Sequence, residues 1–164
     1  MQKRGFTVSE LMVVIGIIVI LGGIGVTNFG GFKRAQDLKS TATSLANYIR
    51  DTQQKSITQE IGPALGVSAK WGVRIEAQSG GDDSYTIFYC NVCTTINSVN
   101  RIVLPNSVEF TVPAQGGAAL DIIFSKLYGA PEGGNQTITI TQIGGGDSKT
   151  INISNNGLIE VVDS

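Results

Sequence analysis

The chain opens with a short basic segment, Met1 to Gly5, followed by a long apolar one. Residues 11–32 contain no charged residue, and residues 11–21 are almost all Leu, Met, Val or Ile. Because a helix rises about 1.5 Å per residue, roughly 20 apolar residues are enough to cross the core of a bilayer. The pattern predicts a transmembrane helix over residues 6–32, with Lys3 and Arg4 in the cytoplasm and the rest of the chain outside it.

The pattern becomes amphipathic after residue 32. Apolar and small residues then recur at steps of three and four, which is typical of a helix with one buried stripe: Ala35, Leu38, Ala42, Leu45, Ile49 and Gln53. We predict that this second half of the helix occupies residues 33–62 and ends between Ile57 and Gly62-Pro63. Such a helix is too long to be buried in a head of about 100 residues, so part of it needs lipid or neighbouring chains to cover it.

Residues 63–164 have the alternation and the Gly- and Asn-rich turns of a β-rich head domain. Thr137 to Thr141 alternates cleanly, so one face of that strand is expected to be wet and the other to face the helix. The last four strands are predicted to form consecutive hairpins. The expected strands are Trp71–Ala77, Tyr85–Cys90, Arg101–Leu104, Val108–Val112, Leu120–Phe124, Thr137–Gln142, Lys149–Ile153 and Leu158–Val162. The predicted fold class is therefore α+β, a long N-terminal α-helix packed on a C-terminal antiparallel β-sheet head.

Composition argues against catalysis and against binding of nucleic acid. The chain has no His, which is the commonest general base and metal ligand, and we find no active-site motif. Its formal net charge of −1 gives no general attraction for phosphate, and no Arg lies in the last strand. We predict a protein that is not an enzyme, has no cofactor and does not bind nucleic acid.

Glu10 is an unusual residue at the start of an apolar run, because a carboxylate is costly in hydrocarbon. It could simply cap the first helical turn. The string from Gly5 to Ile15, however, resembles the type IV prepilin signature. This resemblance implies that a prepilin peptidase cuts between Gly5 and Phe6, leaving residues 1–5 as a leader peptide. It also implies that Phe6 is then N-methylated and that Glu10 is the assembly carboxylate.

The finer resemblance is to the GspH/FimT-type minor pilins and pseudopilins. It rests on Leu45 to Arg50, on Leu104 to Phe110 and on the terminal run Thr137 to Val161. It implies a structural subunit, and a minor one, of a type IV pilus or a type II secretion pseudopilus. The implied partners are other pilin or pseudopilin subunits, an inner-membrane assembly platform, the prepilin peptidase and membrane lipid before assembly.

The implied location is the inner membrane, with the head outside the cytoplasm, and then a periplasmic or extracellular filament. Two alternatives stay open. One is a subunit at the filament tip that acts as an adhesin or binds DNA, and the other is a permanently membrane-anchored binding domain.

Two further groups could carry chemistry in the head. Cys90 and Cys93 are too few, without His, to complete a zinc site, and in an oxidising space we favour a small disulfide over two thiols. Asp82, Asp83 and Asp147 lie in Gly-rich loops without the alternating spacing of a calcium loop. We therefore predict no metal site, and we expect these three residues to lie in solvated turns.

Overall fold

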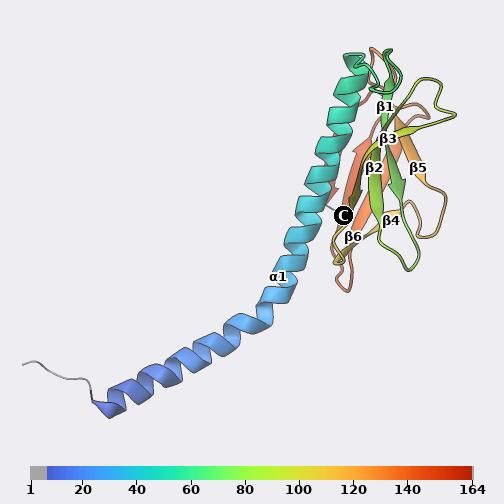
Figure 1. Cartoon of the computed structure of the whole chain (residues 1–164). Helices are drawn as coiled ribbons and strands as arrows, with labels where there is room; N and C mark the ends of the chain where they lie inside the picture. Colours follow the sequence, from blue (N-terminus) through green and yellow to red (C-terminus); the bar gives the residue numbers. More distant parts are fainter. Residues whose placement is uncertain (1–6, 164) are drawn as a thin grey trace, which may run out of the picture. The chain divides into compact units, whose positions relative to one another are not determined.

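The structure is a computed structural model that describes residues 7–163, without the side chains of residues 24–29. The described residues form one helix and eight strands (Figure 1). By its internal contacts the chain divides into two compact units between Arg34 and Ala35. The first unit holds the N-terminal part of the helix, and the second holds the rest of the helix and all the strands.

The helix α1 spans Val8–Ile57, which is 50 residues. It ends where Gln59 adopts a φ of 54° and where the Glu60 N–H donates to the Lys55 carbonyl oxygen at 2.9 Å. A residue in the left-handed region just after the last turn is a common way for a helix to stop. The predicted end, between Ile57 and Gly62, agrees with this boundary.

The expected membrane-spanning helix over residues 6–32 is not found. Within the residues that the structure describes, no helix is long and apolar enough to cross a membrane.

The strands of the head form two antiparallel four-stranded sheets. The first has the order β3-β2-β1-β5 and the second the order β4-β6-β7-β8. Their bounds are β1 Lys70–Glu76, β2 Ser84–Cys90, β3 Asn97–Val103, β4 Val108–Val112, β5 Leu120–Ile123, β6 Gln136–Gln142, β7 Ser148–Ile153 and β8 Ile159–Asp163. All eight predicted strands are present, and the α+β prediction is confirmed.

One prediction about connectivity is wrong. The last four strands do not form consecutive hairpins, because β5 pairs with β1 in the first sheet and only β6, β7 and β8 are neighbours in both sequence and space. Strand β5 has only four residues, and its Ile122 faces Val73 of β1 with both side chains completely buried. The position of β5 is therefore set by the burial of its side chains against β1, and β5 forms no hairpin with β6.

The core of the head lies between the second part of α1 and the two sheets (Figure 1). Of the predicted stripe, Leu38, Ala42, Leu45 and Ile49 are buried, whereas Ala35 is exposed and Gln53 is partly buried. The strands and the residues next to them contribute other large buried side chains, among them Val73, Ile75, Phe110, Ile122, Phe124, Ile138, Ile140, Ile151 and Ile153. The head therefore has a complete core of its own.

Gln53 lies in the predicted stripe, where its side chain makes hydrogen bonds to two loops. Its side-chain amide donates to the carbonyl oxygens of Gly129 at 2.8 Å and Gly157 at 2.7 Å. Both glycines have positive φ, and a Cβ on Gly157 would lie 2.7 Å from the Gly129 oxygen. The two loops and the helix thus meet at a junction where only glycine fits.

Candidate functional site

The first turn of α1 is closed by a reciprocal cap between Thr7 and Glu10. The Glu10 carboxylate oxygen Oε2 accepts hydrogen bonds from the Thr7 backbone N–H and from the Thr7 hydroxyl, each at 2.9 Å. In return the Glu10 N–H donates to Thr7 Oγ1 at 3.3 Å. This is a capping box, in which two otherwise unpaired backbone N–H groups of the helix start are satisfied by side chains.

The capping box is followed by a continuous exposed apolar segment. From Leu11 to Leu21 every residue except Gly16 is a large apolar one, and these side chains are between 47 and 71 % exposed. We call residues 11–21 the apolar segment. Soluble monomers rarely expose contiguous apolar surface of this extent, which normally marks an interface.

The predicted processing residues fall partly outside the described chain. Gly5 and Phe6 lie outside the described residues, so the structure places only Glu10 of this group. Glu10 sits on the first turn with Thr7 and Ser9, directly before the apolar segment. The role of Thr7 as the helix cap was not predicted, although Thr-x-x-Glu before an apolar run is the sequence signature of a capping box.

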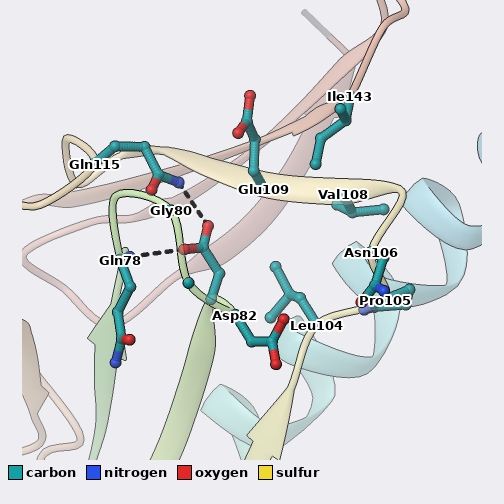
Figure 2. A pocket seen from close by; sticks show the side chains of 12 residues that line it. Gln78, Gly80, Asp82, Leu104, Pro105, Asn106, Val108, Glu109, Gln115 and Ile143 are labelled. Atoms are coloured by element: carbon teal, nitrogen blue, oxygen red, sulfur yellow. Dashed lines mark hydrogen bonds between the residues drawn. The ribbon is translucent and has the colours of Figure 1, made fainter.

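The head carries a pocket of about 280 Å³ where the β1–β2 loop meets β4 (Figure 2). Its wall includes Asp82, Leu104, Pro105, Glu109 and Ile143, all labelled in the figure. Asp82 and Glu109 give it two carboxylates that solvent reaches.

Asp83 borders the same pocket but is buried, with 5 % of its surface exposed. Its Oδ1 accepts from the Gln78 N–H at 2.8 Å. Its Oδ2 accepts from the Phe110 N–H at 2.6 Å and from Gln115 Nε2 at 2.7 Å. The expectation of a solvated turn is therefore wrong for Asp83. Its carboxylate joins the β1–β2 loop of the first sheet to β4 of the second.

The other candidates are separated in space or already engaged. Among the residues that the structure describes, no group of three or more His, Cys, Asp or Glu side chains is placed to hold a metal ion. Cys90 and Cys93 form a disulfide with their Cα atoms 4.8 Å apart, at the end of β2. The aromatic residues Trp71, Tyr85 and Tyr89 are buried, so they serve the core.

Burial also affects one titratable group. The ring of Tyr85 packs on the ring of Tyr48, with the ring centres 5.8 Å apart. Burial, together with the neighbouring Tyr48, raises the pKa of Tyr85 to about 12 from its ordinary value of 10.0. On the first sheet's outer face, Arg74 makes two hydrogen bonds of 2.7 Å to Asp121, which raises the pKa of Arg74.

The chain was compared with known proteins by sequence and by fold. No model of a protein family matches the sequence, and no curated protein sequence matches it either. Two solved structures of the minor pseudopilin EpsH from the type 2 secretion system of Vibrio cholerae share the fold. The first has a TM-score of 0.54 and 12 % identity, and the match covers 77 % of this chain and 97 % of EpsH. The second has a TM-score of 0.50 and 12 % identity, and covers 77 % and 94 %.

These matches confirm the predicted fold. The chain has the pseudopilin-like architecture of a helix packed on two antiparallel sheets, and this agrees with the resemblance to GspH-type proteins read from its sequence. Since identity is only 12 %, the comparison concerns the fold, and function has to be argued from the residues of this chain.

Proposed function

We propose that this chain is a structural subunit of a type II secretion pseudopilus or a type IV pilus, and that it joins the filament through its N-terminal helix. The observation that carries this proposal is the apolar segment, which stays exposed beside a head with its own complete core. The pseudopilin-like fold and the prepilin-like string from Gly5 to Ile15 support it.

The energetic argument follows from the exposed side chains. The apolar segment has ten large apolar residues, each roughly half exposed or more. Full burial of one such side chain contributes about 1.5–3 kcal/mol, so covering the remaining exposed area gives on the order of 10 kcal/mol. Helices of neighbouring subunits, packed side by side, would supply this cover and form the filament core.

The proposal includes processing of the N-terminus. A prepilin peptidase would cut between Gly5 and Phe6, and the new terminal amine of Phe6 would be methylated. Cleavage also removes Lys3 and Arg4, whose charges oppose burial of this end among apolar helices. The proposed partners are therefore the peptidase, an assembly platform and other pilin-like subunits, and the proposed setting is a membrane-associated or periplasmic filament.

Intact-mass analysis of the full chain from its own cells tests the processing. We expect a mass that corresponds to a chain starting at Phe6 with one added methyl group. A chain that still starts at Met1, in cells with an active prepilin peptidase, would overturn the processing step. Gly5→Ala is the matched variant, because it should keep the leader and block entry into sedimentable filaments.

Glu10 is proposed to contribute its charge as well as its cap. The alternative is that Glu10 only caps the helix, a role that its hydrogen bonds from Thr7 already support. Glu10→Gln separates the two roles, because Gln also serves at this position of a capping box but carries no charge. Thr7→Ala is the reciprocal variant, since it removes the hydroxyl of the cap and keeps the carboxylate.

The readout is the fraction of subunit recovered in sheared, sedimented filaments. If the charge acts in assembly, Glu10→Gln loses most of this fraction and Thr7→Ala retains it. If Glu10 acts only as a cap, Thr7→Ala lowers the recovered fraction more than Glu10→Gln, which leaves it nearly unchanged. That second result would remove Glu10 from the assembly mechanism.

A further inference from the structure

Among the described residues, hydrogen bonds from other parts of the chain cover the outer edges of β4 and β5, and they reach the outer edge of β8 only at Ile159. On β4 the Phe110 N–H is held by Asp83, and the Phe110 carbonyl oxygen accepts from Gln115 Nε2 at 2.8 Å. On β5 the Ile123 carbonyl oxygen accepts from the Glu132 N–H at 2.7 Å. On β8 the Ile159 carbonyl oxygen accepts from Arg50 Nη2 at 3.1 Å. Such covering groups reduce unwanted pairing with other strands.

The outer edge of β3 is different. The Leu104 N–H donates to the Asp83 carbonyl oxygen at 2.8 Å in register with the β2–β3 ladder. Because the bonds of an antiparallel ladder alternate, Arg101 and Val103 point their N–H and C=O groups away from β2. Within the described part of the chain, no hydrogen bond reaches these four backbone groups. A bulge at Val99 interrupts the earlier part of β3, so the open edge begins after it.

The same alternation of ladder bonds shows which backbone N–H and C=O groups of β8 point away from β7. The Ser154 N–H donates to the Leu158 carbonyl oxygen at 2.9 Å, in register with the β7–β8 ladder. Ile159, Val161 and Asp163 therefore point their backbone groups outward, in agreement with the bond from Arg50 to Ile159. Beyond Ile159, the described residues supply no hydrogen bond to this edge.

The two edges lie on opposite flanks of the helix. Tyr48 packs on Tyr85, whose partner across the ladder is Ile102 of β3. Arg50 reaches Ile159 of β8 instead. Two helical positions two residues apart point in directions about 200° apart. One flank of the head thus ends in β3 and the other in β8.

Both strands also run in the same direction. Each starts near the C-terminal end of α1, where Tyr89, the partner of Asn97, binds the Ala64 N–H and where Gln53 holds Gly157. Each then runs toward the Asp37–Lys39 part of the helix. There Ser107, which follows β3, bonds to Asp37, and Asp163 shares a hollow with Lys39. In two heads placed side by side with parallel helices, β3 of one and β8 of the next would be parallel.

We propose that the open edge of β3 pairs in parallel with the β8 edge of a second copy of this chain. This inference rests on the proposed function, because a filament of parallel helices supplies the side-by-side arrangement. Four hydrogen bonds would form, from the N–H and C=O groups of Arg101 and Val103 to Ile159, Val161 and Asp163 of the second copy. The Ile159 oxygen can keep its bond from Arg50, since a carbonyl oxygen has two lone pairs.

This register also matches the side chains in charge and polarity. Arg101 would lie opposite Glu160 of the second copy, and Val103 opposite Val162. The Arg101 Nε donates to Ser84 Oγ at 3.0 Å and lies 3.9 Å from Glu76, but the side chain is 52 % exposed, and its two Nη groups would face the exposed Glu160. Val103 and Val162 are 46 % and 44 % exposed, and the contact would cover both. On the other face Ile102 would meet Val161, which is 40 % exposed.

The contact is heterologous, so each head would use one edge for each of two neighbours. Repeated contacts of this kind give an open array and do not close into a dimer. The pairing covers only about four residues of β3, and short isolated strand pairs are marginal in water. We therefore expect it to form among subunits held together by their helices and to be absent between free heads.

Cysteine cross-linking in the full chain tests the contact. Opposite residues of paired strands have Cα atoms about 4.8 Å apart, within the range that a disulfide accepts. The full chain that carries both Val103→Cys and Val162→Cys should give a ladder of cross-linked multimers on mild oxidation of its filaments. Each single variant alone should give none, and the native cysteines are already joined to each other.

A matched control places one cysteine on a closed edge. Val112→Cys of β4, where Val112 is 41 % exposed, replaces Val103→Cys in combination with Val162→Cys. We expect at least about tenfold more cross-linking for the β3–β8 combination, because contact makes the reaction effectively intramolecular. Adding Glu160→Arg should lower this yield about two- to fivefold, whereas Asp82→Arg should not, since a like-charge pair across strands is unfavourable.

The outcomes separate this inference from the proposed function. Sedimentable filaments that contain the cysteine variants, with no cross-linking above the β4 control, would overturn the β3–β8 contact and leave the filament function standing. A parent chain that never enters filaments would overturn the proposed function, and with it this contact. Dimers without a ladder would also refute the contact, since they indicate a closed pairing.

Discussion

Replacing Asp83 with Ala removes the carboxylate that joins the two sheets. Three donors lose their acceptor: the N–H groups of Gln78 and Phe110 and the amide of Gln115. Phe110 is completely buried, so its N–H gains no bond to water in compensation. A buried donor left without a partner costs about 1–3 kcal/mol. Gln78 and Gln115 are exposed and can turn their donors toward water, so they add only the loss of two bonds to a charged group. We therefore expect the free energy of unfolding to fall by about 2–4 kcal/mol.

Urea unfolding followed by the fluorescence of Trp71 measures this loss. Trp71 is the single tryptophan of the chain and is buried in the head, so its emission reports on the head alone. At a slope of about 2 kcal/mol per molar urea, the midpoint should fall by about 1–2 M. The free energy of unfolding of Asp83→Asn should lie between those of the parent and of Asp83→Ala. The Asn side chain keeps one acceptor oxygen, but its NH2 group would face a donor that the carboxylate had accepted from.

Asp82→Ala is the matched control, since Asp82 is the exposed neighbour in the same loop. Exposed substitutions without special contacts usually change stability by less than about 0.5 kcal/mol. If Asp83→Ala and Asp82→Ala unfold within about 1 kcal/mol of each other, then Asp83 does not join the sheets as argued. A changed slope instead of a changed midpoint would show that the two sheets unfold separately.

Three further results are expected from the same unfolding assay. Gln53→Ala should lower the free energy of unfolding by about 1–3 kcal/mol, because two loop carbonyls lose their donor. Gln54→Ala is the control, since Gln54 is the next residue and is exposed, and it should leave this free energy nearly unchanged. Reduction of the Cys90–Cys93 disulfide should cost about 2 kcal/mol or less, since it closes a very short loop, and a larger loss would contradict that estimate. Between pH 10 and pH 12 stability should fall, because Tyr85, with a pKa raised to about 12, stays protonated in the folded head while the unfolded chain ionises; Tyr85→Phe should flatten this fall.

Most of the fold could be predicted because burial leaves a strong periodic trace. The step of three and four from Leu38 to Ile49 predicted the buried stripe of α1, and the alternation of Thr137 to Thr141 predicted a strand with Ile138 and Ile140 inward. Each of these elements has one buried face and one solvent-exposed face, so its apolar residues recur with a single period.

The first half of β3 and the position of β5 could not be read in this way. Residues 97–100 are polar except for Val99 and lie on an edge strand with both faces largely exposed, so no alternation marks them as a strand. The pairing of β5 with β1 joins residues that are far apart in sequence, as in the contact of Ile122 with Val73. Local patterns predict that a strand exists, but its partner depends on what the folded core buries.

Polar residues with structural roles were the least predictable. Asp83 follows Gly80-Gly81-Asp82, a string with ordinary turn chemistry, and only the approach of β4 turns its carboxylate into a buried acceptor. Thr7, by contrast, had a readable signal, since Thr-x-x-Glu before an apolar run predicts a capping box. The apolar segment was recognised from its composition, whereas the described residues contain no helix that is long and apolar enough to cross a membrane.

The capping box changes how the assembly role of Glu10 has to be understood. Both bonds from Thr7 go to the same carboxylate oxygen, Oε2, so the cap uses only half of the acceptor capacity of the group. The second oxygen can then accept a bond from a cation of a neighbouring subunit without loss of the cap. A carboxylate held in one rotamer also gives up less side-chain entropy on docking than a free one. This gain is small beside that of the charge itself, so Thr7→Ala should retain most of the filament fraction and Thr7→Ser, which keeps the hydroxyl, should assemble like the parent.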